Sequence, residues 1–334
     1  MPTAPNLITI SQAVELIRDN QVVALPTETV YGLFGLANSQ IAVSRVFSIK
    51  NRPADNPLIC HFRSIDQIRK YVSNIPEVIE FLLSRFAPGP LTVILNIPKN
   101  SPLSPALAGL STVCCRIPNN ELTLEILRTV NIPLFGPSAN TSTRVSATSP
   151  DMVHDDLGDR ISGIVDGGTT NIGLESTIID YREGQIRILR PGAIGVVELE
   201  NALEEFNDIN IQRIIVKDNN SEVKTVVPGN KYRHYSPTVE VHRYQNQDIN
   251  KKTAVAGFDE DIQKFLNSNK DSGDTTIKSL GSIHNLTEVS HNLYSNLASL
   301  DNLGVNQVYF LGYDLGQSSL AIAISNRLNK VILK

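Results

Sequence analysis

Short apolar runs, each ended by a proline, a glycine or a polar residue, alternate with helical segments along most of this chain. Residues 22–25 form one such run, which Pro26 ends, and Ser39 is placed to cap a helix with apolar positions from Ile41 to Ile49. The short runs predict buried strands, and the 3.6-residue period predicts helices. Mixed strands and helices with short connections predict an α/β sheet.

The first two-thirds of the chain carry most of these elements. We expect further helices at 65–72, 77–86 and 122–130. We expect further strands at 58–60, 91–97, 112–117, 161–165, 177–180 and 186–189.

The composition and the apolar periodicity of the chain change near Asp218. Residues 218–222 are polar and weakly periodic, and turn-forming residues follow at 228–230. We therefore predict a first domain at 1–211, a linker at 212–237 and a second domain at 238–334. The second domain is expected to alternate strands at 239–242, 254–258, 276–280 and 308–311 with helices at 262–266, 286–300 and 322–328. This order predicts a small, doubly wound, mostly parallel sheet.

The charge balance argues against a protein whose main task is to bind nucleic acid. The net charge is -4 and the pI is about 5.9, whereas such proteins usually carry a positive excess. The chain also lacks an apolar run of the roughly 18 residues that a membrane span needs, and its first residues do not resemble a signal peptide. We expect a cytoplasmic protein.

The three cysteines do not form a metal-binding pattern. No C-x-x-C pair is present, so a structural zinc site is not expected. Cys114 and Cys115 are neighbours and would point to opposite faces of a strand, which disfavours a disulfide between them. We interpret all three as small buried side chains in a reducing compartment.

Polar segments rich in glycine and proline interrupt the strands of the first domain. Loops at strand ends are where sheet proteins place binding groups. The segments are residues 26–33, 50–53, 56–58, 137–140, 174–177, 190–192 and 231–235.

Two of these loops have the chemistry of an anion site. Lys50 and Arg52 are two cations in a loop that Pro53 ends, and they can converge on one polyphosphate. A solvated helix end is the alternative. Ser138 and Asn140 offer a hydroxyl, an amide and backbone N–H groups to an anion or a ribose. An ordinary turn or helix cap is the alternative here.

Arg116 and Arg190 each end a strand beside a proline. An arginine in this position can clamp a carboxylate or a phosphate, and it is at least as often part of a surface ion pair. His61 follows an apolar strand, where a structural histidine is the commoner case. The G-x-x-x-x-G-K-[ST], G-x-G-x-x-G and H-E-x-x-H patterns are absent, and Gly136–Asn140 lacks the spacing of a nucleophile elbow.

The residue sequences of these motifs, and their order along the chain, resemble those of the YrdC family of threonylcarbamoyl-AMP synthases. The motifs are Pro-Thr-Glu-Thr-Val-Tyr-Gly-Leu, Lys-x-Arg-Pro, Asn-Pro-Leu, Pro-Gly-Pro-Leu-Thr, Ser-Ala-Asn, Asp-Gly-Gly, Glu-Ser-Thr and Arg-Pro-Gly. The resemblance covers about residues 7–200. Residues 228–237 look like the linker of the long form, which adds a Rossmann-like domain. The chain departs from the family at Thr143, where glycine is common, at Asn230, where methionine is usual, and at Ala147, where proline is usual.

The resemblance implies a YrdC-like twisted mixed sheet and a nucleotidyltransferase. The reaction joins L-threonine, bicarbonate or CO2 and ATP into L-threonylcarbamoyladenylate and releases pyrophosphate. Mg²⁺ would enter with the phosphates of ATP, without direct protein ligands. The product would pass to a tRNA threonylcarbamoyl-transferase complex that makes threonylcarbamoyladenosine. Direct contact with tRNA is not required.

The same resemblance implies the site residues. Lys50 and Arg52 would be the catalytic cations. The threonine pocket would be formed by Thr29, His61, Arg116, Gly136 and Ser176. ATP would be held by Arg52, Asn56, Thr112, Ser138, Asn140, Ser146, Arg190, Tyr232 and His234.

Three other readings remain open at this point. The first is an RNA-binding module, which the acidic pI and the lack of an aromatic and basic stripe disfavour. The second is a carbamoyl-transfer domain like those of hydrogenase maturation factors, which come with zinc-finger and acylphosphatase modules that this chain lacks. The third is an amino-acid or nucleotide sensor without turnover. A sensor is disfavoured because the chain retains the candidate ATP-site residues Lys50, Arg52, Ser138, Asn140 and Arg190.

Overall fold

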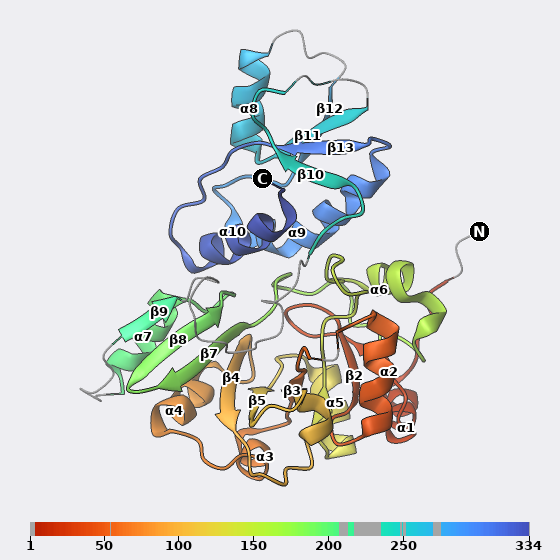
Figure 1. Ribbon diagram of the computed structural model, residues 1–334, viewed down its shortest axis with the longest axis vertical. Coiled ribbons are helices and arrows are strands. Elements are labelled where there is room, and N and C mark those ends of the chain that lie inside the picture. Colours follow the sequence, from red (N-terminus) through yellow and green to blue (C-terminus); the bar gives the residue numbers. More distant parts are fainter. Residues whose placement is uncertain are drawn as a thin grey trace.

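The computed structural model describes residues 4–53, 55–206, 213–216, 235–247, 249, 252–269 and 275–333. Two sheets organise it, one of nine strands and one of four. We call the nine-stranded sheet with its helices the N-terminal domain, and the four-stranded sheet with its helices the C-terminal domain (Figure 1).

The N-terminal sheet is mixed. Its order is β1-β2-β6-β3-β5-β4-β7-β8-β9. The pairs β3/β5, β4/β7 and β8/β9 are parallel and the others are antiparallel. The strands are β1 (Val23–Leu25), β2 (Gly32–Leu36), β3 (Ile59–His61), β4 (Leu91–Asn96), β5 (Thr112–Arg116), β6 (Leu134–Phe135), β7 (Thr177–Arg182), β8 (Gln185–Arg190) and β9 (Arg213–Val216). The predicted twisted mixed sheet is confirmed.

The described helices of this domain pack against the sheet and share its main apolar cluster. They are α1 (Ile10–Arg18), α2 (Gln40–Lys50), α3 (Ile65–Arg69), α4 (Glu77–Phe86), α5 (Glu121–Val130), α6 (Pro150–Leu157) and α7 (Val196–Glu204), with 3₁₀ turns η1 (Ser104–Leu107) and η2 (Gly158–Arg160). Ser39 caps α2 as expected, because its hydroxyl accepts from the Ala42 amide at 3.2 Å. Strand residues alternate between the helix-covered core, which includes Cys115, and a smaller apolar cluster, which includes Cys114.

The C-terminal sheet is entirely parallel, in the order β10-β13-β11-β12. Its strands are β10 (Glu240–Arg243), β11 (Thr253–Gly257), β12 (Thr276–Ser279) and β13 (Gln307–Phe310). Its helices are α8 (Asp259–Ser268), α9 (Leu286–Ser299) and α10 (Ser319–Val331), with the turn η3 (Leu300–Asn302). Figure 1 shows α8 on one face, and α9 and α10 on the other, between this sheet and the N-terminal domain. The expected small, parallel, doubly wound unit is confirmed.

The described part of the chain differs from the sequence-based prediction in several places, and the helices α1, α6 and α7 and the strand β6 were not predicted. Residues 161–165 are not a strand, because the segment pairs only at Ile164, in isolated bridges to Leu7 and Ala24. β2 lies partly inside the 26–33 segment, which we had read as a loop. β9 lies inside the predicted linker and pairs with β8, so it extends the N-terminal sheet. None of the helices described here is long and apolar enough to cross a bilayer.

Candidate functional site

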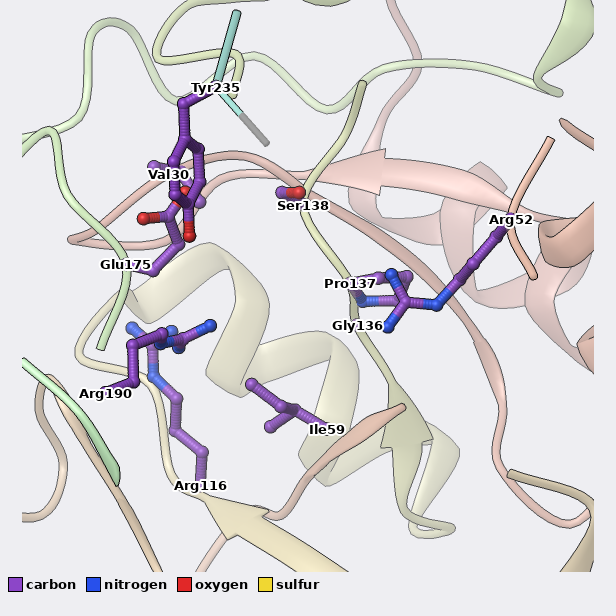
Figure 2. Close-up of a pocket in the computed structure, with 10 residues that line it drawn as sticks. All are labelled: Val30, Arg52, Ile59, Arg116, Gly136, Pro137, Ser138, Glu175, Arg190 and Tyr235. Carbon is purple, nitrogen blue, oxygen red and sulfur yellow. The ribbon is translucent and has the colours of Figure 1, made fainter. Parts of the chain in front are cut away.

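A small pocket lies where several strands of the N-terminal sheet end. Its volume is about 50 Å³. Figure 2 shows the Arg116 and Arg190 guanidinium groups close together on one wall, with Arg52 entering from the opposite side. The lining residues are Val30, Arg52, Ile59, Arg116, Gly136, Pro137, Ser138, Glu175, Arg190 and Tyr235.

Arg116 ends β5 and is held by the loop that follows β1. Its Nη2 donates to Thr29 Oγ1 at 2.8 Å and lies 2.9 Å from Glu28 Oε2. The loop is shaped by Thr27, whose hydroxyl donates to the Val30 carbonyl at 2.7 Å. Thr29 and Arg116, both predicted for the threonine pocket, are therefore in direct contact. The buried guanidinium is available to an anion that enters the pocket.

Arg190 ends β8 and is bonded to the neighbouring strand end. Its Nε and Nη2 each donate to Ser176 at 3.0 Å, to the carbonyl and the hydroxyl oxygen. The Ser176 hydroxyl also lies 2.7 Å from Thr92 Oγ1. Burial lowers the pKa of Arg190, and Tyr235 and Glu175 oppose that effect. The predicted ATP residue Arg190 and the predicted threonine residue Ser176 thus form one unit.

Glu175 is the only carboxylate among the described residues that line the pocket. Ser146 donates to its Oε1 at 2.6 Å, and Tyr294 donates to Oε2 at 2.8 Å. Arg327 Nη2 lies 3.1 Å from Oε2. Burial alone would raise the pKa of Glu175, but Arg327, Arg190 and these hydroxyl donors hold it at about 2. Glu175 is therefore a permanent, fully bonded anion at neutral pH.

We expected Lys50 and Arg52 to converge on one polyphosphate; Arg52 lines the pocket, and Lys50 lies beside a lining residue, Ser138. Its Nζ donates to the carbonyl oxygens of Ser138 and Asn140, and the side chain is only 1% exposed. Burial, reinforced by the nearby charge of Arg52, moves its pKa well below the usual value. Lys50 is the last residue of α2, and its side chain reaches the backbone of the 138–140 loop. Lys50 supports this loop, and Ser138 lines the pocket.

Arg52 lines the pocket beside Asn56. Its Nε and Nη2 donate to the carbonyl oxygens of Asn56 and Pro57 at 3.1 and 2.9 Å, which orient the guanidinium. Burial and the charge of Arg190 lower its pKa to about 10. Within the described residues, the buried side-chain oxygens of Asn56 and Asn140 have no hydrogen-bond partner. Such unsatisfied amide groups are expected where a ligand supplies the partner.

His61 and Gly136 lie against each other at the base of the site. A Cβ on Gly136 would overlap the imidazole, so only glycine permits this approach. His61 packs against the Phe34 ring at 4.8 Å between centroids. Burial and the charge of Arg116 keep its pKa well below the usual value. Its buried Nδ1 has no hydrogen-bond partner by geometry in the described chain.

The structure brings most of the predicted residues together. Lining residues are Arg52, Arg116, Gly136, Ser138 and Arg190. Residues that bond to or pack against a lining residue are Thr29, Lys50, Asn56, His61, Ser146 and Ser176. The Asn140 carbonyl shares the Lys50 ammonium with Ser138. Tyr232 and His234 lie outside the described residues.

Thr112 stands apart from the other predicted ATP residues. It begins β5 whereas Arg116 ends it, so the two are about 13 Å apart along the strand. Thr112 lines a second cavity, of about 430 Å³, at the other end of the sheet. The two side chains nevertheless share a face, because positions four apart in a strand point the same way.

The sequence analysis gave no role to several residues of the site, among them Glu175, Tyr235, Tyr294 and Arg327. Glu175 and Tyr235 lie inside segments that we singled out as loops, so their position was visible but their contacts were not. Tyr294 and Arg327 come from helices of the C-terminal domain. They lie more than 100 residues from Glu175, and no local pattern marks them.

Comparisons with family models and known proteins find relatives that span most of this chain. A model of the Sua5, YciO and YrdC proteins, described as telomere recombination, matches residues 15–192, and a model of the threonylcarbamoyl-AMP synthase C-terminal domain matches residues 194–331. The threonylcarbamoyl-AMP synthase of Pyrococcus abyssi is 37% identical over 95% of this chain and 92% of its own length. That of Bacillus subtilis is 36% identical over 96% and 92%.

A solved structure adds the full two-domain architecture to the comparison. The crystal structure of P. abyssi Sua5 complexed with L-threonine superposes with a TM-score of 0.80 at 34% identity, and it covers 97% of this chain and 96% of that one. Identity above 30% over nearly the whole length of both chains, together with both domain models, shows the family. This chain belongs to the threonylcarbamoyl-AMP synthase family.

Proposed function

We propose that this protein is a nucleotidyltransferase that makes L-threonylcarbamoyladenylate from L-threonine, bicarbonate and ATP. The observation that carries the proposal is the convergence of Arg52, Arg116 and Arg190 on one pocket whose single lining carboxylate is already paired. Arg116 is paired with Glu28, but three buried guanidinium groups beside one lining carboxylate still favour an anionic ligand. The family relation identifies the anions as threonine and ATP.

The reaction has two steps. The threonine amine combines with bicarbonate to give a carbamate and water. A carbamate oxygen then attacks the α-phosphorus of ATP, and pyrophosphate leaves. Both reactants of the second step are anions, so fixed positive charge is needed to bring them together and to stabilise the transition state.

The residues of the pocket suit these steps. Arg116, bonded to Thr29, would hold the threonine carboxylate, and the neutral His61 would accept a hydrogen bond from the ligand. Arg52 and Arg190 would bind the phosphates. Lys50 would act through the 138–140 loop, whose Ser138 hydroxyl faces the substrates. No covalent enzyme intermediate is required.

The adenosine end of ATP would extend toward Thr112. The face of the sheet between Arg116 and Thr112 carries the apolar side chains of Ile59, Cys114 and Ile178, which suit a nucleobase. We expect lining side chains to move when the substrates bind.

Mg²⁺ is proposed to enter with ATP. Among the described residues, no group of three histidine, cysteine or acidic side chains is arranged to hold a metal, and Glu175 is fully bonded. Phosphate oxygens would therefore supply the ligands. The ion would neutralise part of the triphosphate charge.

The product is a mixed anhydride, so it must pass to a transferase, and we propose the tRNA threonylcarbamoyl-transferase complex. We propose the cytoplasm as the location, where three free buried thiols suit a reducing environment. An RNA-binding module or a sensor without turnover is not favoured, because the full-length relatives are named as synthases.

The test is pyrophosphate release by the purified protein with ATP, Mg²⁺, bicarbonate and L-threonine, omitting each in turn. We expect release only with all four components. Release that needs neither threonine nor bicarbonate would indicate a nucleotide hydrolase. Binding of ATP without release would indicate a sensor.

A further inference from the structure

Arg327 belongs to the C-terminal domain, yet its guanidinium forms part of the support behind the pocket wall. The side chain is completely buried. Its Nε and Nη2 lie 3.2 and 3.1 Å from Glu175 Oε2, and Nη1 donates to the Pro191 carbonyl oxygen. One side chain of α10 thus holds both the 174–177 and the 190–192 loops.

Tyr294 of α9 reinforces this arrangement. Its hydroxyl lies 3.0 and 2.8 Å from the two carboxylate oxygens of Glu175. Its ring stacks on Tyr235, a lining residue, at 5.5 Å between centroids. The Arg327 guanidinium carbon lies 5.5 Å from the centroid of the same Tyr235 ring. Two helices of the C-terminal domain therefore contact the pocket through Glu175 and Tyr235.

The domains pack closely enough to keep these contacts dry. Val30, Val145 and Leu174 of the N-terminal domain belong to the same apolar cluster as α9 and α10. Gly173, at φ +79, faces the backbone of Ser290, and any larger residue would overlap it. The Glu175–Arg327 ion pair is buried in this interface. Removal of either partner would leave the other as an uncompensated buried charge.

Glu175 is a potential competitor for the substrates. Its carboxylate lines the pocket with Arg190, and their charges act on each other. After Arg327, Arg190 is the cation whose charge acts most strongly on the buried carboxylate. An Arg190 engaged by Glu175 would be turned away from Ser176 and from the phosphates.

We propose that Arg327 is a positioning residue for this reaction: it takes up the charge of Glu175, so that Arg190 and Ser176 stay directed at the substrates. The C-terminal domain thereby completes the site of the N-terminal domain. The inference rests on the proposed function, since it concerns how that site holds ATP.

The test compares full-length variants by calorimetric titration with Mg·ATP and by the kcat and KM of pyrophosphate release. Arg327→Met is expected to weaken ATP binding and lower kcat by about tenfold or more each. Arg327→Lys should recover part of the loss, because its ammonium still neutralises Glu175. The double variant Glu175→Gln/Arg327→Met should bind ATP more tightly than Arg327→Met alone, because the neutral amide of glutamine does not compete with ATP for Arg190.

Arg144→Met is the matched control. It removes another arginine–carboxylate pair between the domains, Arg144 with Asp301 at 3.4 Å, whose arginine is 45% exposed. We expect ATP affinity and kcat within about twofold of the wild type, since exposed pairs contribute little. A loss equal to that of Arg327→Met would show a general effect of domain docking and overturn the proposal.

Two further outcomes would overturn it. One is a folded Arg327→Met with wild-type ATP affinity and turnover, and the other is a double variant no better than Arg327→Met. If circular dichroism shows that Arg327→Met does not fold, Tyr294→Phe decides, because it removes only a hydroxyl donor to Glu175. A loss of ATP affinity of about twofold or more supports the proposal, and an unchanged affinity refutes it. A wild type that binds ATP without releasing pyrophosphate would refute the proposed function instead, and the binding comparison would still test Arg327.

Discussion

Lys50 Nζ donates to the carbonyl oxygen of Ser138 at 2.6 Å, although the two residues are 88 positions apart in the chain. The bond joins the end of α2 to the loop that presents the Ser138 hydroxyl to the pocket. Lys50 therefore acts as an internal support, whereas Arg52, two residues later, lines the pocket itself.

This difference predicts different behaviour for the two cations. Lys50→Met removes the buried ammonium that the Ser138 and Asn140 carbonyl oxygens share, although the Ser138 oxygen keeps the Asn140 amide as a donor. The free energy of unfolding should therefore fall by about 2 kcal/mol, and the rate of pyrophosphate release should fall with it. Arg52→Met should keep most of the stability and lose most of the rate. Urea unfolding and initial rates measure the two effects, with the exposed Lys70→Met as control. A Lys50→Met of wild-type stability without activity would place Lys50 on the substrate instead.

Arg116→Lys should weaken the binding of threonine selectively. A lysine is a single point charge and cannot serve Thr29, Glu28 and a ligand carboxylate with the planar fork that arginine offers. We expect threonine affinity to fall by about tenfold, which is about 1.4 kcal/mol, with ATP affinity nearly unchanged. Calorimetric titration with each ligand measures this, and the half-exposed Arg128→Lys is the control. Equal losses for both ligands would argue against a carboxylate clamp.

Thr143→Gly should stabilise the protein. Thr143 is exposed and adopts φ +80, a conformation that a β-branched residue occupies at a cost of about 1–2 kcal/mol. Glycine removes this strain but adds about 0.5–1 kcal/mol of entropy to the unfolded chain. The expected net gain is about 0.5–1 kcal/mol by chemical unfolding. Thr143→Ala keeps the strained conformation and should gain less than glycine, and the reverse order would contradict the explanation.

Lys330 should make stability depend on pH. Burial, together with the charges of Arg327 and Arg190, lowers its pKa to about 7, whereas an unfolded lysine titrates near about 10.4. Between these values the unfolded state binds more protons, so stability should rise with pH, by at most about 1.4 kcal/mol per pH unit. Urea unfolding from pH 7 to pH 9.5 should show this rise in the wild type and a smaller one in Lys330→Met. Parallel curves for the two proteins would contradict the lowered pKa.

The local sequence was enough to predict most of the elements and most of the loops of the site. Apolar periodicity found α2, α4, α5 and ten of the thirteen described strands, because burial of one face repeats at the spacing of the element. It failed at 161–165, where an apolar segment crosses the end of β1 and pairs only at Ile164. It also missed the two-residue strand β6, which is too short to carry a period.

The sequence by itself determined which side chains were available for the chemistry. The motifs that contain them lie in loops or at strand ends, and the side chains are those of Arg52, Arg116, Ser138 and Arg190. Only the tertiary structure decided what each one does. It placed Lys50 under the Ser138 loop, put Thr112 at the far end of β5, and brought Arg327 against Glu175 across 152 positions of the chain. The physical reason is that a hydrogen bond or an ion pair depends on distance in space, and local patterns report only the face that an element buries.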